Sequence, residues 1–344
     1  MDEDSGLQES IIETAKLDTA HAKACNSAAK KLRDLGLVKR VKSIPVKGTV
    51  FGVTSRRTYS PSLFSGYMLS HVISAVISLN SVQANPSEES FPVEITERQR
   101  VFALDNFEMY LRGRWITYSE QMRRVLSLID HPCNLGLIDN GLFISQRNMP
   151  QTTDTEVLHF FNKVMEPSVR AWDVLARTES PPILVGINSF VRSKLTRAVS
   201  SGLAIESIDD DSLPYLHKTE SENPWMGEGA LIYSLLNKPG LRSVFYRLTK
   251  EHLGSLAPDS LGDSGGVVAT YVRTSNAIFQ IEIPYYQFKD DVTKYEEVVS
   301  SIVWLAEFQK HEVPMPLSYA RVVCEDRNLR QSLDGLMTMI RRMR

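Results

Sequence analysis

The sequence predicts a mixed α/β fold with a helical extension at the N-terminus. Short segments rich in Val and Ile alternate with longer segments whose apolar residues recur at helical spacing. The 344 residues contain neither an internal repeat nor a low-complexity linker, and 42% of them are hydrophobic, which is enough for a large core. We therefore expect a helical extension over residues 1–45 and one compact domain over residues 46–344.

The charge balance and the cysteines limit the class of protein. The chain has 39 Lys and Arg residues against 41 Asp and Glu, so a nucleic-acid surface would require local clusters of basic side chains. Cys25, Cys133 and Cys324 are odd in number and far apart, which favours reduced thiols. The first residues are acidic and polar, unlike a signal peptide, and no run of about 18 apolar residues occurs. We expect a cytoplasmic protein that does not span a membrane.

The N-terminal half is predicted to contain a long helix followed by paired strands. Over residues 7–36 the apolar side chains recur at helical spacing, and Gly36 suits the end of a helix. Residues 48–55 and 66–82 are rich in Val and Ile and have turn residues between them, which is typical of paired strands. Residues 97–130 carry apolar side chains at helical spacing, which predicts a second long helix.

The rest of the chain alternates strands and helices. The segment "CNLGLIDNGLFI" is a short apolar strand, and the run Ile183, Leu184 and Val185 suits a strand covered on both faces. The same rules predict helices over 154–177 and about 190–201, strands over 241–248, 266–273 and 277–283, an amphipathic segment over 289–310 and a basic terminal helix from about residue 327.

One motif, "LGDSGGVVATYV" at residues 261–272, contains the Gly-Asp-Ser-Gly-Gly pattern of trypsin-like enzymes. A serine nucleophile requires a histidine base and a carboxylate that orients it. His71 and Asp105 precede Ser264 in trypsin-like order, but the helical spacing over 97–130 does not suit the two barrels of a trypsin-like enzyme. A glycine-rich turn accounts for the motif, and a serine hydrolase based on Ser264 is kept as an alternative hypothesis.

Several short motifs, in order, resemble the NurA family of DNA-end nucleases. The C-terminal pattern "IFQIEIPYY", a helix, "VPMPLSYARVV" and a final basic helix resembles the end of that family. The resemblance covers about residues 48–344. Upstream, "VFGVTSRRTY" is similar to the family's first core strand, "SEQMRRVLSLI" to its acidic helix, "LGLIDNGLFI" to its Asp-Gly strand, and "PILVGINSFVRSKL" to a later strand and helix.

The resemblance implies a fold, a chemistry and partners. It implies an RNase H-like mixed sheet flanked by helices, with an acidic cluster that holds Mn²⁺ or Mg²⁺. It also implies a homodimer that processes DNA ends in DNA repair together with a hexameric ATPase of the HerA type. The apolar residues of the terminal helix could pack on a second copy or on the chain's own core: Leu329, Leu333, Leu336, Met337 and Ile340.

Glu120 and Asp139 are the candidate catalytic residues and metal ligands. Asp139 ends an apolar strand before an Asn-Gly turn, which leaves its carboxylate at the edge of the sheet. Glu120 lies 19 residues earlier on a helix that can return alongside this strand, and the spacing resembles that of the family. Hard divalent cations take such carboxylate ligands. Two structural alternatives remain: Asp139 stabilises a hairpin turn, and Glu120 pairs with Arg123 or Arg124 on a solvated helix face.

Two positions depart from the family's pattern. Thr54 stands where the family has its first catalytic aspartate, and a hydroxyl is a weaker ligand for Mg²⁺ or Mn²⁺ than a carboxylate. Arg321 stands where the family has a histidine, and arginine stays protonated, so it cannot act as a base. Either the site is a weakened nuclease site, or the chain is a non-catalytic subunit that binds DNA or organises an assembly.

Three arginines are candidate contacts to nucleic acid. Arg56 and Arg57 lie two and three residues after Thr54, and with Arg321 they would face a phosphate backbone near the former catalytic position. The alternative is that paired arginines are ordinary surface residues.

Overall fold

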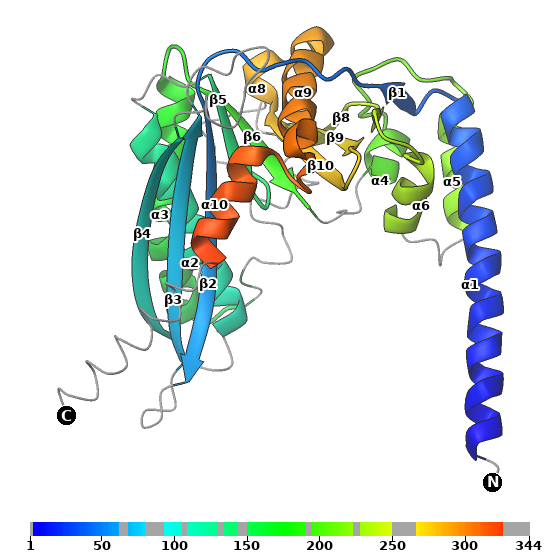
Figure 1. The fold of residues 1–344 in the computed structure, drawn as a ribbon, viewed down its shortest axis with the longest axis horizontal. Coiled ribbons are helices and arrows are strands. Elements are labelled where there is room, and N and C mark those ends of the chain that lie inside the picture. Colours follow the sequence, from blue (N-terminus) through cyan, green and yellow to red (C-terminus); the bar gives the residue numbers. More distant parts are fainter. Residues whose placement is uncertain are drawn as a thin grey trace.

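In the computed structural model the described residues form a mixed sheet flanked by helices, as the α/β prediction requires (Figure 1). None of the helices in this part of the chain combines the length and the apolar character needed to cross a membrane. The described residues are 3–61, 68–79, 93–104, 109–129, 134–142, 150, 152–189, 195–222, 228–249 and 266–325.

The first half of the sheet is an antiparallel meander joined to two parallel strands. β2 (Val50–Pro61) pairs with β3 (Met68–Leu79), and β3 pairs with β4 (Val93–Leu104), all antiparallel. On its other side β2 runs parallel to β5 (Leu135–Asp139), which runs parallel to β6 (Ile183–Asn188). The paired strands predicted from residues 48–55 and 66–82, and the two apolar strands that follow, are confirmed.

The second half of the sheet is antiparallel and includes the chain's first strand. β10 (Ile278–Pro284) pairs with β6 and with β9 (Gly266–Arg273), which also pairs with the short β8 (Tyr246–Thr249). β7 (Leu241–Ser243) lies between β9 and the edge strand β1 (Val38–Arg40). The strand order is β1-β7-β9-β10-β6-β5-β2-β3-β4, so strands far apart in the sequence, such as β1 and β7, are neighbours in one sheet.

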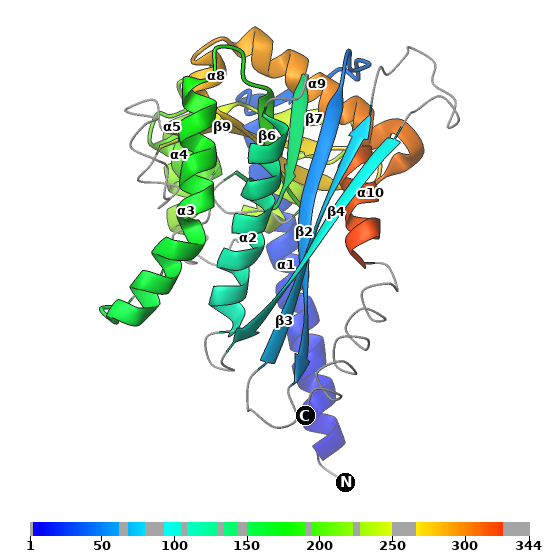
Figure 2. The same cartoon turned by 90° about the vertical axis from the view of Figure 1, so that its left-hand side faces the viewer.

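Helices cover both faces of the sheet (Figures 1 and 2). On one face lie α2 (Met109–Leu128) and α3 (Thr155–Arg177), and on the other lie α9 (Val292–Glu307) and α10 (Met315–Glu325). Each face has its own apolar layer, because successive strand residues point to opposite sides. The shorter helices are α4 (Leu195–Ser200), α5 (Ser212–Glu222), α6 (Glu228–Leu235), α8 (Tyr285–Phe288) and the 3₁₀ turn η4 (Phe308–Lys310).

The N-terminal helix α1 (Glu3–Asp34) agrees with the helix predicted over residues 7–36. Its last turns pack against α5 and α6 through buried side chains that include Cys25, Ala29 and Leu32. Gly36 follows the helix at a φ of 86°, a left-handed conformation that glycine adopts without strain. The first half of α1 projects beyond the sheet (Figure 1).

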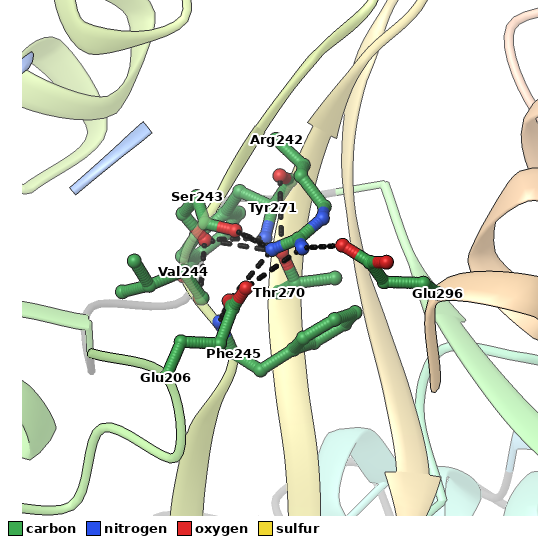
Figure 3. A network of polar contacts seen from close by, with 8 residues as sticks. All are labelled: Glu206, Arg242, Ser243, Val244, Phe245, Thr270, Tyr271 and Glu296. Carbon is green, nitrogen blue, oxygen red and sulfur yellow. Dashed lines mark hydrogen bonds and ion pairs between the residues drawn. The ribbon is translucent and has the colours of Figure 1, made fainter. Parts of the chain in front are cut away.

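A buried arginine ties three segments of the second half together (Figure 3). Arg242 on β7 is 1% exposed and donates to both carboxylate oxygens of Glu206, at 2.7 and 2.8 Å. It also donates to Glu296 on α9 at 2.6 Å, and its guanidinium lies 4.1 Å from the ring centre of Phe245. Glu206 accepts a further hydrogen bond from the backbone N–H of Phe245. The network joins the loop after α4 and helix α9 to the sheet.

The predicted helix over residues 97–130 is wrong in its first part and correct in its second. Residues 97–104 belong to β4, and the helix begins at Met109. β4 pairs with β3 residue by residue, from Val93 with Leu79 to Leu104 with Met68, so the ladder overrides the local helical spacing. Helices α5, α6 and α10 were not predicted, and the terminal helix expected from residue 327 lies outside the described residues.

Candidate functional site

The site is centred on Asp139, the last residue of β5. All five residues of this strand are buried, and Asp139 is 1% exposed. The chain then turns through Asn140 and Gly141, at φ values of 67° and 88°. Asn and Gly tolerate this left-handed region best, which is why the Asn-Gly pair ends the strand here. The turn predicted after Asp139 is therefore present. The Asp139 carboxylate, expected at the edge of the sheet, is buried.

Helix α10 lies directly against β2 because β2 has a glycine at the contact. A Cβ atom on Gly52 would come within 2.6 Å of the carbonyl carbon of Pro316. Thr54 and Arg56 follow at alternate positions of the same strand and so share the face of Gly52. This close approach brings the middle of α10 over the end of β5.

Arg321 on α10 pairs with Asp139 through two hydrogen bonds. Its Nε donates to Oδ2 at 2.9 Å and its Nη2 donates to Oδ1 at 2.5 Å, a bidentate arrangement. The Thr54 hydroxyl also donates to Oδ2, at 2.7 Å, and Arg321 Nη2 donates to the Ser189 hydroxyl at 2.7 Å. Burial lowers the pKa of Arg321, but its hydrogen bonds to Asp139 and the charge of that carboxylate outweigh burial and raise the pKa above its usual value. The guanidinium is therefore a permanent cation.

Arg56 lies at the solvent side of this pair. Its Nη2 is 3.8 Å from Asp139 Oδ2, and its Nε is 3.3 Å from Glu325 Oε1. The Arg56 side chain is 33% exposed and that of Glu325 is 62% exposed, whereas that of Asp139 is fully buried. Two of the three predicted nucleic-acid arginines, Arg56 and Arg321, are thus brought together at one carboxylate.

Glu120 lies on α2, on the other face of the sheet. It is 3% exposed, so it is not on a solvated face, but its Oε1 does pair with Arg123 Nε at 3.3 Å. The next residue, Gln121, donates to the backbone carbonyls of Val53 at 3.1 Å and Asp139 at 2.7 Å. The helix returns alongside the strand as predicted. In the part of the chain that the structure describes, Asp139 forms ion pairs with Arg56 and Arg321.

Glu282 and Asn188 belong to the same region, and the sequence analysis missed both. Glu282 accepts hydrogen bonds from the backbone N–H of Leu142 at 3.1 Å and the Asn188 amide at 2.8 Å, so it holds the turn that follows Asp139. The Tyr118 hydroxyl donates to the Leu142 carbonyl at 2.6 Å, and burial raises the pKa of this tyrosine. The available signal was a glutamate inside the apolar strand segment "IFQIEIP".

Solved structures share this arrangement of sheet and helices. The NurA nuclease from Sulfolobus solfataricus superposes with a TM-score of 0.60 and 10% sequence identity, covering 97% of this chain and 96% of that one. NurA bound to dAMP and manganese superposes with a TM-score of 0.53 and 12% identity, covering 96% and 97%. The chain has the NurA fold. No family model and no curated protein sequence matches it.

The residues of this NurA-like chain do not fit a Mn²⁺ or Mg²⁺ site. Such ions are held by converging anionic oxygens, and both oxygens of Asp139 already accept hydrogen bonds from Arg321. Thr54 contributes a neutral hydroxyl at the neighbouring strand position. Within the described ranges, no group of three or more His, Cys, Asp or Glu side chains could hold a metal. The permanent positive charge of Arg321 lies against the Asp139 carboxylate and would repel a metal cation there.

Some predictions of the sequence analysis fall on residues whose placement is not described. Ser264 and Asp105 lie outside the described residues, and for His71 and Arg57 only the backbone, on β3 and β2, is described. Cys25 and Cys324 are buried free thiols, as expected for reduced cysteines. Cys133 and the apolar residues of the terminal helix, Leu329, Leu333, Leu336, Met337 and Ile340, also lie outside the described ranges.

Proposed function

We propose that this chain is a NurA-like DNA-binding component of a nuclease–ATPase assembly, and that its own metal-dependent cleavage is weakened or lost. The observation that carries the proposal is the bidentate pair of Arg321 and Asp139, which uses both oxygens of the buried carboxylate. A carboxylate neutralised in this way is a poor ligand for a divalent cation. The NurA fold supports a role in the handling of DNA.

Arginines are the proposed contacts to the DNA backbone. The Arg56 side chain is more exposed than those of Arg321 and Asp139, at 33% against 17% and 0%. Guanidinium groups bind phosphate oxygens through paired N–H donors. Arg57 follows it on β2 and is proposed from the sequence alone. Arg321 contributes its positive charge near the same surface while its hydrogen bonds go to Asp139 and Ser189.

A second candidate function is an active deoxyribonuclease that uses Glu120 and Asp139 with Mn²⁺ or Mg²⁺. It is favoured by the NurA fold and by two buried acidic residues at the predicted positions. In this function Asp139 would first have to exchange Arg321 for the metal. We rank it second because that exchange would leave Arg321, whose side chain is only 17% exposed, without its charge partner.

The assembly itself is also a proposal. The family resemblance of the sequence motifs is the basis for proposing a homodimer, a HerA-type ATPase partner, a role in DNA repair and a cytoplasmic location. An RNase H-like core is supported by the strand order β4-β3-β2-β5-β6, in which an antiparallel meander adjoins two parallel strands. The division into an extension over 1–45 and a domain over 46–344 belongs to the same proposal.

The test compares DNA binding with DNA cleavage in the full chain. Fluorescently labelled linear duplex DNA should bind with equal affinity in Mn²⁺ and in EDTA, and binding should weaken steeply with salt because phosphate contacts release counterions. Degradation in Mn²⁺ should be slow or absent over the same period. Rapid Mn²⁺-dependent degradation, abolished both by EDTA and by a folded Asp139→Asn variant, would favour the nuclease instead.

A further inference from the structure

We infer that Glu325 competes with a DNA phosphate for Arg56 and thereby limits the affinity of this surface for DNA. The inference rests on the proposed function and adds a regulating residue to it. It begins from the position of Glu325 at the end of α10, one helical turn after Arg321. Because α10 packs against β2 at Gly52, the Glu325 carboxylate lies beside Arg56 of that strand.

The contact between Arg56 and Glu325 is an ion pair that a phosphate can replace. The atoms Nε and Oε1 lie 3.3 Å apart, and Arg56 Nε is itself buried and has no hydrogen-bond acceptor among the described residues, although the Arg56 side chain as a whole is 33% exposed. The Glu325 side chain is 62% exposed, so it can rotate into solvent without losing buried contacts. An ion pair with one largely exposed partner, such as Glu325, contributes little, whereas phosphate oxygens accept strong bidentate hydrogen bonds from a guanidinium.

Arg56 has two carboxylate neighbours, Asp139 and Glu325, and only Glu325 can compete with a phosphate for it. Asp139 is fully buried and is matched by Arg321 at hydrogen-bond distance, while its distance to Arg56 is 3.8 Å. Glu325 is therefore the nearer of the two carboxylates to Arg56, and the only one of the two that is exposed. An incoming phosphate monoanion restores the same balance once Glu325 has moved away, so the exchange leaves no uncompensated charge in the site.

The experiment measures DNA affinity in EDTA for Glu325→Gln and for a matched control, Glu297→Gln. Glu297 is an exposed glutamate on α9, so both substitutions remove one negative charge from a helix surface. Glu325→Gln should tighten binding about two- to fivefold, the range of an exposed ion pair, and Glu297→Gln should change it much less. Equal effects of the two variants would mean that only the net charge matters, and would overturn the inference.

A double variant tests whether the effect passes through Arg56. In an Arg56→Met background, Glu325→Gln should lose its advantage over Glu297→Gln, because the competed cation is gone. An undiminished advantage would contradict the inference.

A second measurement keeps the inference separate from the proposed function. Inorganic phosphate is titrated into ¹⁵N-labelled protein while the Nε–H signal of Arg56 is followed by NMR. The signal should respond at a lower phosphate concentration in Glu325→Gln than in the unmodified chain. If no folded variant binds DNA but this phosphate response is present, the proposed function fails and the competition stands. An identical response in both proteins overturns the competition, whatever the result with DNA.

Discussion

Arg321 and Asp139 are 182 positions apart in the chain and meet in two parallel hydrogen bonds, Nε to Oδ2 at 2.9 Å and Nη2 to Oδ1 at 2.5 Å. The Asp139 side chain is fully buried and that of Arg321 is 17% exposed. Each group is therefore the main charge partner of the other in an environment with little water. The pair links helix α10 to the centre of the sheet, so its loss should lower the free energy of unfolding.

Arg321→Met should lower the free energy of unfolding by about 3–5 kcal/mol, because it leaves the buried Asp139 carboxylate without its cation. Urea denaturation followed by circular dichroism measures this change. Lys294→Met is the control, since it breaks an ion pair with Asp291 whose side chains are 58% and 43% exposed, and it should cost about 0–1 kcal/mol. Similar small losses in both variants would contradict a structural role for the buried pair.

Thr54→Asp combined with Arg321→His should create affinity for Mn²⁺. The change adds a carboxylate on the strand position that contacts Asp139 and removes the fixed cation. Because affinity follows the number of charged ligands, Mn²⁺ binding measured by calorimetry should rise on the order of tenfold or more, with a gain in Mn²⁺-dependent DNA cleavage. Addition of Asp139→Asn to the double variant should remove both gains. A double variant that folds but binds Mn²⁺ no better than the unmodified chain would exclude this position as a former metal site.

Arg242→Met should destabilise the fold by about 3–5 kcal/mol, since Glu206 would be left nearly buried without its bidentate partner. Thermal or urea unfolding measures the loss. Glu296→Gln is the matched test of the other arm of this network, and it should cost only about 0–1 kcal/mol because Glu296 is 51% exposed. The reverse order of the two effects would show that the network of Figure 3 depends on α9 instead of on the loop that carries Glu206.

The sequence predicted most strands and the location of Asp139, and it failed where distant pairing decides the structure. Val- and Ile-rich segments and the Asn-Gly turn are local signals, and they placed β2, β3 and β5 correctly. The apolar spacing predicts a helix over residues 97–104 of β4, because only their ladder with β3 determines their conformation. The pairing of Arg321 with Asp139 has no local signal at all. The sequence shows an arginine where the family has a histidine, but the partner of Arg321 depends on how α10 packs on Gly52.

The unfolding free energy should depend on pH through His311. Burial lowers the pKa of this histidine from its ordinary 6.5, so the unfolded chain binds a proton more readily than the native one. The stability from His311 is present above about pH 6.5 and is lost as the pH falls through the lowered pKa. Urea denaturation at a series of pH values should give a smaller acid loss for His311→Gln. An unchanged pH dependence in that variant would contradict the assignment.

Ser264→Ala should leave folding and DNA binding unchanged. The prediction comes from the sequence, in which a Gly-rich turn accounts for the Gly-Asp-Ser-Gly-Gly motif. Labelling with a fluorophosphonate probe and urea denaturation of both proteins provide the measurements. Probe labelling that depends on Ser264 would revive the serine hydrolase hypothesis.

The strand order has a consequence for how the chain is made. Asp139 leaves the ribosome 182 residues before Arg321, which at 5–20 residues per second is on the order of 10 to 35 s. During that interval β5 also lacks the helix that covers this face, and β1 and β6 still await β7 and β10. The nascent chain must therefore keep these strand edges open until β10 is made, and a future core carboxylate hydrated until α10 is made. We expect a chain truncated before α10 to be captured by chaperones or to aggregate, even though it already contains the whole sheet.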